Sequence, residues 1–160
     1  MNKKNIFLTG APSTGKTTVI EKIIEKLDHP ANGFYTEEER VDGKRVGFLM
    51  KTLDGRKGYL AHQDIKSDFH IRRYGVSIDN IIIILDEIGK MECFSKTFKQ
   101  AALKALDAPN IVIGTITLGG DAFILEIKKR EDMEINEVTD DNRDLLPDLI
   151  LRQVAQFRFI

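Results

Sequence analysis

The chain alternates two patterns of apolar residues. Short continuous apolar runs are typical of buried parallel strands, and apolar residues that recur every three or four positions are typical of amphipathic helices. The apolar runs are residues 5–9, 81–87, 110–117 and 133–138. The helical pattern covers residues 16–27, 94–106, 122–130 and 142–157. Strands therefore alternate with helices, which predicts a three-layer α/β domain with a mainly parallel sheet.

A different pattern lies between the first helix and the later strands. Two segments rich in β-forming residues, 33–40 and 44–53, flank the dipeptide Asp42-Gly43, which is a strong hairpin signal. A second turn at residues 53–58 predicts that the antiparallel ribbon continues. We expect a β-hairpin insertion in a single domain that spans residues 1–160.

The loop after the first strand has the sequence GAPSTGKTT and carries the first chemical signal. Glycine, four residues, then glycine, lysine and threonine form a phosphate loop, and this one lies between a strand and a helix, as the motif requires. Its backbone N–H groups and the helix N-terminus would face the phosphates. We expect Lys16 to reach the β- and γ-phosphates, Thr17 to hold magnesium and Thr18 to contact the α-phosphate. The predicted nucleotide-binding residues of this loop are Gly10, Ala11, Pro12, Ser13, Thr14, Gly15, Lys16, Thr17 and Thr18.

Two carboxylates end the most apolar strand, whose sequence is IIIILDE. Ligands of open α/β sheets bind at the carboxyl ends of the strands, where Asp86 can hold magnesium. Glu87 can accept a proton from a water molecule that attacks the γ-phosphate. The two sites together predict Lys16 and Glu87 as catalytic residues, with Thr17 and Asp86 as metal ligands.

Composition excludes several other classes of protein. The 160 residues carry a net charge of −1, so no overall positive charge attracts nucleic acid or a membrane surface. The single Cys93 excludes an internal disulfide and a cysteine-based zinc site. No apolar run is long enough for a signal peptide or a bilayer span. We expect a cytoplasmic monomer that binds nucleoside triphosphates but neither membranes nor nucleic acids.

Four sequence blocks resemble a family of small nucleoside-triphosphatases that includes the cancer-related nucleoside triphosphatase of animals and thermophilic microbial relatives. In order, these blocks are GAPSTGKTT, GFYTEEERVDGKRVGFLMKTLDGRKGYLA, DEIGKMECFSKTF and EVTDDNRDLLPDLI. The resemblance implies a RecA-like sheet and slow, magnesium-dependent hydrolysis of ATP, GTP, CTP and UTP. Similar sequences have also been labelled nucleotide kinases.

The resemblance adds three residues to the predicted nucleotide site. Arg45 lies where the family carries an arginine, although a cross-strand charge pair on the hairpin is an equal alternative. Asn142 and Arg143 match a block that would lie beside the base or ribose, together with Thr139. The alternative for this block is that Thr139 or Asp140 caps the last helix.

The chain also departs from the family pattern. Only residues 77–85 separate Val76 from Asp86, where family members have a segment long enough for a helix. We therefore expect that one helix is missing and that the enzyme is slow.

Three functions remain open at this point. Hydrolysis with water as the acceptor is the leading hypothesis because Glu87 follows Asp86 directly. A kinase would pass the γ-phosphate to a nucleotide, a nucleoside or a polynucleotide end, and Glu87 would then accept the proton of that acceptor. A nucleotide-dependent switch would use slow hydrolysis to time an interaction with a partner.

Overall fold

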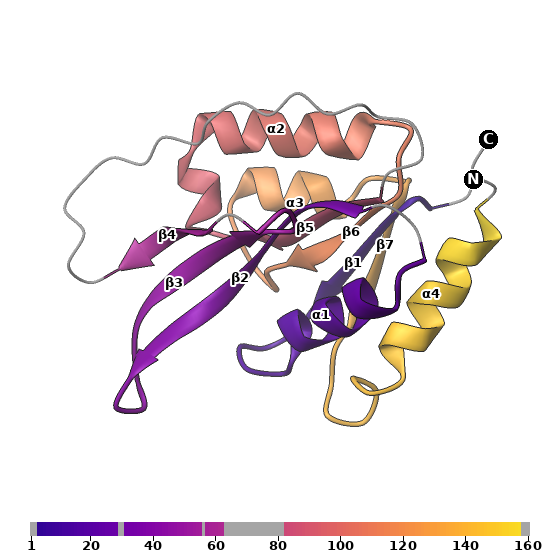
Figure 1. The fold of residues 1–160 in the computed structure, drawn as a ribbon. Helices are drawn as coiled ribbons and strands as arrows, with labels where there is room; N and C mark the ends of the chain where they lie inside the picture. Colours follow the sequence, from indigo (N-terminus) through magenta and orange to yellow (C-terminus); the bar gives the residue numbers. More distant parts are fainter. Residues whose placement is uncertain (1–2, 29–30, 56, 63–81, 158–160) are drawn as a thin grey trace.

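The computed structural model describes residues 3–28, 31–55, 57–62 and 82–157. In this part of the chain seven strands form one sheet in the order β4-β3-β2-β5-β6-β1-β7 (Figure 1). The strands are β1 (Asn5–Thr9), β2 (Ala31–Val41), β3 (Lys44–Thr52), β4 (Lys57–His62), β5 (Ile82–Ile88), β6 (Val112–Ile116) and β7 (Met133–Glu137). The helices are α1 (Lys16–Lys26), the 3-10 helix η1 (Glu92–Phe94), α2 (Lys96–Asp107), α3 (Ala122–Lys128) and α4 (Leu146–Gln156).

The centre of the sheet is parallel. β1 pairs with β6 on one side and with β7 on the other, and β5 pairs with β6 and β2. Every residue of β1 and β6 is buried, as expected for strands that are covered on both faces. The predicted α/β fold class with a mainly parallel sheet is confirmed, and β6 lies between the strand of the phosphate loop and the strand of the carboxylates.

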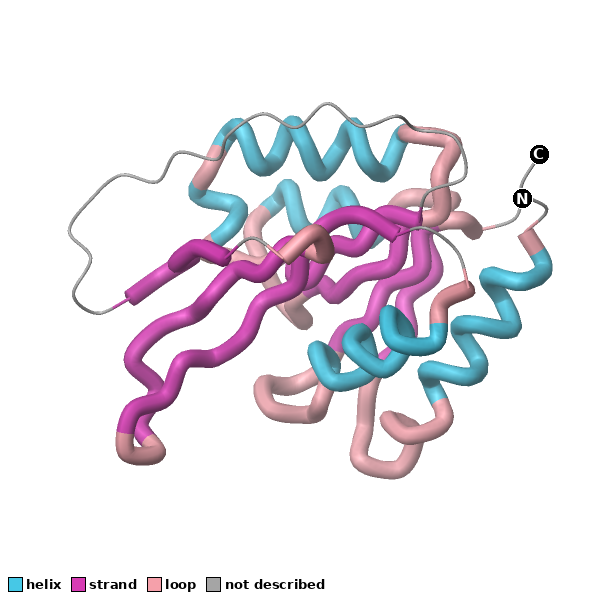
Figure 2. The backbone as a smooth tube through the Cα atoms, in the orientation of Figure 1, coloured by secondary structure: helices cyan, strands magenta, loops and turns pink. Residues whose placement is uncertain are grey.

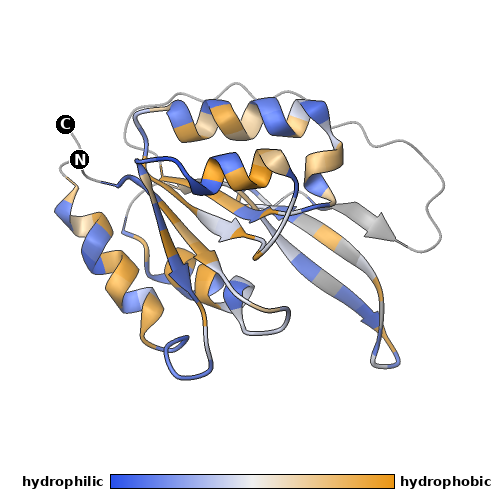
Figure 3. Ribbon diagram, turned by 180° about the vertical axis from the view of Figure 1, so that it is seen from behind, coloured by the Kyte–Doolittle hydropathy of each residue, from blue (hydrophilic) through white to orange (hydrophobic). Residues whose placement is uncertain are grey.

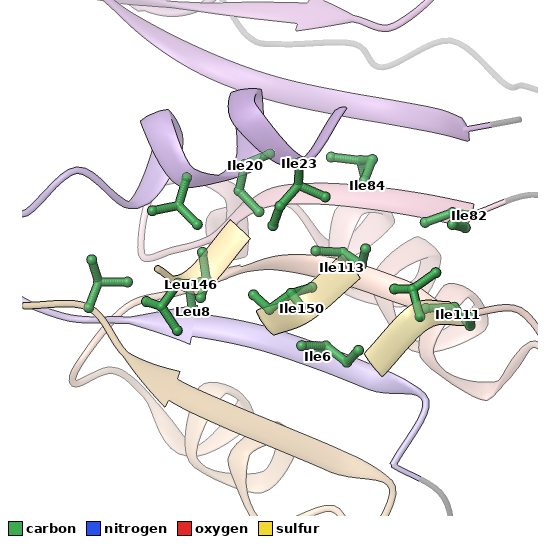
Figure 4. Close-up of a cluster of buried hydrophobic side chains, with 13 residues drawn as sticks. Ile6, Leu8, Ile20, Ile23, Ile82, Ile84, Ile111, Ile113, Leu146 and Ile150 are labelled. Atoms are coloured by element: carbon green, nitrogen blue, oxygen red, sulfur yellow. The ribbon is translucent and has the colours of Figure 1, made fainter. Parts of the chain in front are cut away.

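Two hydrophobic clusters hold the three layers together. α1 and α4 cover one face of the sheet, and α2 and α3 cover the other (Figures 1 and 2). In the first cluster Ile20 and Ile23 of α1 and Ile150 of α4 meet strand residues such as Leu8 and Ile113 (Figure 4). The helices carry polar and apolar residues side by side (Figure 3), so each buries one face and leaves the other exposed.

The predicted hairpin is present, but it is not separate from the main sheet. β2 pairs in an antiparallel manner with β3, which pairs likewise with β4. Residues 31–34 of β2 also pair in parallel with β5, so β2 belongs to both parts of the sheet. The turn has positive φ at Asp42 (49°) and Gly43 (76°), which is the backbone that a two-residue hairpin turn requires. Beyond β5, β2 and β3 run out as a ribbon (Figure 1).

Local capping decides where two of the helices begin. Ser95 accepts a hydrogen bond from the N–H of Phe98, so α2 begins at Lys96 and the preceding residues form η1. Asp121 accepts one from the N–H of Ile124 at the start of α3. α4 begins at Leu146, four residues after the predicted start, and has Pro147 in its first turn. None of the described helices is long and apolar enough to cross a membrane. Of residues 77–85, where we expect a helix to be missing, residues 82–85 belong to β5 and residues 77–81 lie outside the described residues.

Candidate active site

The phosphate loop connects β1 to α1, and its two motif glycines adopt backbone conformations that other residues rarely adopt. Gly10 has φ 148° and Gly15 has φ 95°. A Cβ atom on Gly10 would lie 2.8 Å from the carbonyl oxygen of Val138, so the loop also passes too close to the end of β7 for a side chain. These constraints explain why the motif needs glycine at both positions.

The Lys16 side chain curls back over this loop. Its Nζ donates hydrogen bonds to the carbonyl oxygens of Gly10 (3.1 Å) and Ala11 (2.9 Å). An ammonium group binds ionised phosphate oxygens more strongly than neutral carbonyls. Lys16 can therefore exchange these two partners for a nucleotide without a change in the backbone.

Asp86 lies at the base of the site and is only 1 % exposed. Its Oδ2 accepts hydrogen bonds from the Thr17 hydroxyl (2.9 Å) and from the N–H of Thr36 (3.4 Å), and its Oδ1 accepts one from the Thr115 hydroxyl. Burial raises the pKa of Asp86, whereas these donors and the charge of Lys16 lower it. Three elements besides its own strand therefore fix the orientation of this carboxylate.

The Thr17 and Asp86 oxygens suit a magnesium ion. Both are hard oxygen donors, and they face each other at 2.9 Å across the end of the phosphate loop. Magnesium prefers one or two protein oxygens together with substrate phosphates and water. The two predicted metal ligands are thus adjacent in the fold, although 69 positions separate them in the chain.

Glu87 follows Asp86 at a break in the sheet. The pairing of β5 with β6 shifts register between Leu85 and Ile88, so the two carboxylates lie in an irregular segment. Glu87 is half-buried. Burial and the charge of Asp86 raise the pKa of Glu87, and the charge of Lys16 opposes this rise. A carboxylate with a raised pKa is a stronger base, as proton abstraction from water requires.

A cavity of about 640 Å³ unites the phosphate loop with Glu87. The phosphate loop, Glu87 and Met91 all line this cavity. β2 contributes Thr36 and Glu37, and the segment after β6 contributes Thr117 and Leu118. The remaining lining residues are Gly10, Pro12, Ser13, Gly15, Lys16, Thr17, Thr18 and Glu21. This volume accommodates a nucleoside triphosphate.

Arg143 lies beside the phosphate loop. It lines a smaller cavity of about 110 Å³ with Gly15, Thr18 and Lys22. Its Cδ would be 3.6 Å from a Cβ atom on Gly15, and its guanidinium pairs with Asp140 at 2.9 Å. Arg143 therefore lies beside the phosphate loop, and its predicted contact with the base or ribose stays a prediction.

Asn142 shapes the turn that carries Arg143. Its Oδ1 accepts a hydrogen bond from the N–H of Thr139 and its Nδ2 donates one to the carbonyl of Glu137, both at 2.8 Å. The oxygen and the nitrogen of the Asn142 amide are thus both hydrogen-bonded to the backbone. The predicted contact of Asn142 with nucleotide stays a prediction. The alternative that Thr139 or Asp140 caps α4 is wrong, because this helix begins at Leu146.

Arg45 lies near the turn of the β2–β3 ribbon, and its side chain is outside the described part of the structure. The strand register places Arg45 opposite Arg40. The directly opposed residue thus has the same charge, which does not favour a cross-strand ion pair between these two positions. The predicted contact of Arg45 with nucleotide stays a prediction.

Sequence reasoning missed three residues that contact or flank the two carboxylates. Thr115 and Thr36 bind Asp86 only because β6 and β2 are the neighbours of β5 on the two sides. Glu92 is 4 % exposed, and burial together with the charges of Glu87 and Asp86 raises its pKa to about 7. Two features of the sequence could have pointed to them: Thr115 is a polar residue inside an apolar strand, and Glu92 follows Glu87 by five residues.

The raised pKa of Glu92 predicts a pH-dependent stability. Between its unfolded pKa of 4.5 and its folded pKa of about 7, the folded protein holds a proton that the unfolded chain has lost. The contribution of Glu92 to the free energy of unfolding is therefore greatest below pH 4.5 and is lost as the pH rises to 7. Glu92→Gln cannot lose a proton in this range. Its free energy of unfolding relative to the wild type should therefore be roughly 2–3 kcal/mol higher at about pH 8 than at about pH 5. Urea denaturation at both pH values measures this difference, and an equal difference at both would contradict the assignment.

The fold and the site together define the class of protein. A phosphate loop between a buried strand and a helix, with a carboxylate bound to its threonine, characterises a P-loop nucleotide-binding protein. The cavity that contains the loop is also lined by the second carboxylate, Glu87.

Known proteins agree with this class. The sequence model of the NTPase family matches residues 5–151. "Nucleoside-triphosphatase THEP1" of Thermotoga maritima is 40 % identical over 162 positions, which cover 91 % of this chain and 92 % of that protein. The mouse "Cancer-related nucleoside-triphosphatase homolog" is 39 % identical over 180 positions, covering 92 % and 95 %. The crystal structure of THEP1 from Aquifex aeolicus superposes with a TM-score of 0.78 at 33 % identity, covering 92 % of this chain and 97 % of that one.

The chain belongs to the NTPase family, as its sequence blocks predict. The alignment with the mouse protein is longer than the 160-residue chain itself, so that relative has residues without a counterpart here.

Proposed function

We propose that this protein is a magnesium-dependent nucleoside-triphosphatase that hydrolyses ATP, GTP, CTP and UTP slowly to the diphosphate and phosphate. The observation that carries the proposal is the cavity that Glu87 lines together with Lys16 and Thr17. A phosphate loop alone only binds nucleotide, whereas a base beside the γ-phosphate position can activate water. The names of the relatives, nucleoside-triphosphatases, support the same activity.

Each group of the site has a separate task. The loop N–H groups hold the β- and γ-phosphates, and Lys16 leaves the carbonyls of Gly10 and Ala11 to neutralise the charge that develops on the transferred group. Glu87 orients a water molecule in line with the γ-phosphate and accepts its proton. The leaving group is the nucleoside diphosphate.

Thr17 and Asp86 would hold the magnesium ion. When bound, magnesium would supply positive charge that offsets the negative charge of the phosphates. The chain's own contribution is to keep the Asp86 carboxylate in one orientation through Thr115 and Thr36. Ordered ligands of this kind bind a metal more tightly than ligands that must first be arranged.

We also propose that the base or ribose lies beside Arg143 and Lys22, which flank the small cavity at Gly15 and pair with aspartates. The names of the relatives specify no base, which supports a broad base preference. We further propose that the chain acts as a single-domain monomer in the cytoplasm.

Phosphate release from the four nucleoside triphosphates tests the proposal. The reaction contains magnesium and no acceptor, and parallel reactions omit magnesium or use Lys16→Ala to reveal contaminating enzymes. We expect slow release from all four, which is lost in both controls. Nucleotide binding without release would contradict hydrolysis and would direct attention to a kinase acceptor or to a switch partner.

Thr115 gives a sharper test of the metal site. Thr115 is fully buried, and its hydroxyl donates to Asp86. Thr115→Val keeps the shape but removes this donor, so the magnesium concentration for half-maximal phosphate release should rise by about 10- to 100-fold. Thr115→Ser keeps the hydroxyl and serves as the control. A magnesium titration measures both variants, and an unchanged midpoint in Thr115→Val would show that Asp86 needs no such support.

A further inference from the structure

Gly89 lies at a point where two glutamate side chains converge. A Cβ atom on Gly89 would be 2.6 Å from Oε1 of Glu87 and 2.7 Å from Oε2 of Glu92. Because both oxygens approach the same point, they are at most 5.3 Å apart, the sum of these two distances. Gly89 does not have a positive φ. Its missing side chain therefore provides space for the two carboxyl groups.

Glu92 is buried without a hydrogen-bond partner for one of its oxygens. Its side chain belongs to η1, which packs against β5 and α2, and is 4 % exposed. Among the described residues, its Oε2 has no hydrogen-bond donor. A buried ionised carboxylate without a partner is costly, so this environment favours the protonated acid.

The negative charges near Glu92 also favour its protonated form. Glu87 and Asp86, both on β5, raise its pKa, and burial has the largest effect. The backbone N–H groups of Gly89 and Glu92 favour the ionised form and only partly oppose this rise. Lys99 of α2 and Asp121 act on the neighbouring thiol of Cys93. Glu92 therefore changes its protonation state near neutral pH.

We infer that Glu92 is a positioning residue for hydrolysis, which in its protonated form donates a hydrogen bond through one water molecule to Oε1 of Glu87. Two hydrogen bonds of about 2.7 Å each span up to about 5.4 Å, so one water molecule can bridge two oxygens that are at most 5.3 Å apart. The other oxygen of Glu87 is then free to accept the proton of the attacking water. Glu92 keeps its own proton throughout this step.

This inference rests on the proposed function, in which Glu87 is the base. It predicts that kcat depends on pH, because only the protonated carboxyl group of Glu92 can donate the hydrogen bond. As the pH rises through about 7, Glu92 loses its proton, the bridge loses its donor and two carboxylates repel each other. We therefore expect kcat to fall on the alkaline side of pH 7, with little change in KM.

Two substitutions of Glu92 separate the hydrogen bond from the charge. Glu92→Gln keeps a donor at every pH, so its kcat should stay near the wild-type value at about pH 6 and should not fall above pH 7. Glu92→Leu removes the donor, so its kcat should be lower by about 10²-fold at every pH, which is the effect of a misplaced catalytic group. An alkaline fall that persists in Glu92→Gln, or wild-type kcat in Glu92→Leu, would overturn the inference.

Gly89→Ala tests the same geometry without altering an ionisable group. The added methyl group would push both carboxyl groups aside, so kcat should fall while the Kd for nucleotide stays unchanged. Wild-type kcat in this variant would overturn the proposed arrangement of Glu87 and Glu92.

Carboxyl carbon NMR of the nucleotide-free protein distinguishes a failure of this inference from a failure of the proposed function. One glutamate resonance should titrate near pH 7 and should be absent from Glu92→Gln. If the wild type releases phosphate but both Glu92 variants match its pH profile, the inference on Glu92 fails and hydrolysis stands. If the wild type releases no phosphate, the proposed function fails and this role of Glu92 fails with it, whatever the NMR titration shows.

Discussion

Glu87→Gln is expected to lower kcat by about 10²- to 10⁴-fold, the range typical of a general base. Glutamine keeps the size and one oxygen of the side chain, but it cannot accept the proton of the attacking water. The phosphate loop, Lys16 and Thr17 remain in place, so the Kd for nucleotide should change little. Single-turnover hydrolysis measures the loss of rate, and binding of a fluorescent nucleotide analogue measures Kd.

The control for this variant is Glu126→Gln. Glu126 is an exposed residue of α3, so the same chemical change at this position should leave kcat unaltered. Turnover of Glu87→Gln at the wild-type rate would exclude Glu87 as the base. A Kd that rises as much as kcat falls would instead assign Glu87 to nucleotide binding.

Lys16→Ala is expected to lower kcat/KM by about 10³-fold or more. The ammonium group of Lys16 is held over the loop by the carbonyls of Gly10 and Ala11, within reach of any phosphate bound there. Removing one such group that stabilises the transition state typically costs about 10²- to 10³-fold in kcat, and loss of ground-state phosphate binding adds to this.

An exposed lysine on another helix provides the matched control for Lys16. Lys104 of α2 is exposed, and Lys104→Ala should retain wild-type kinetics. Steady-state kinetics with ATP measures kcat and KM for both variants. Residual phosphate release by Lys16→Ala within tenfold of the wild type would contradict the role of Lys16 as the main electrostatic stabiliser.

Local sequence patterns predict most of the fold. The continuous apolar runs that become β1 and β6 are buried at every position, and the helical spacing of Val19, Ile20 and Ile23 places α1 against the sheet. Local patterns did not predict that β2 pairs with both β5 and β3. Its first residues pair in parallel with β5 and its later residues pair with β3, and this change of partner depends on the order of strands in the sheet.

In the candidate site, too, contiguous motifs were predictable and contacts between distant parts of the chain were not. The phosphate loop and the pair Asp86-Glu87 are contiguous motifs whose chemistry can be recognised from a few neighbouring residues. Thr115, Thr36 and Glu92 belong to the site through strand order and through the path of the chain after β5. Asn142 illustrates the reverse case, since its side chain forms local hydrogen bonds with the backbone that the sequence block did not indicate.

In the proposed reaction, water accepts the γ-phosphate. Hydrolysis of ATP in water labelled with oxygen-18, with magnesium and without any other acceptor, tests whether it does. We expect each phosphate released to carry one labelled oxygen from the solvent, and we expect release to stop in Glu87→Gln. Phosphate that carries no solvent oxygen, or a γ-phosphate recovered on another molecule, would exclude water as the acceptor.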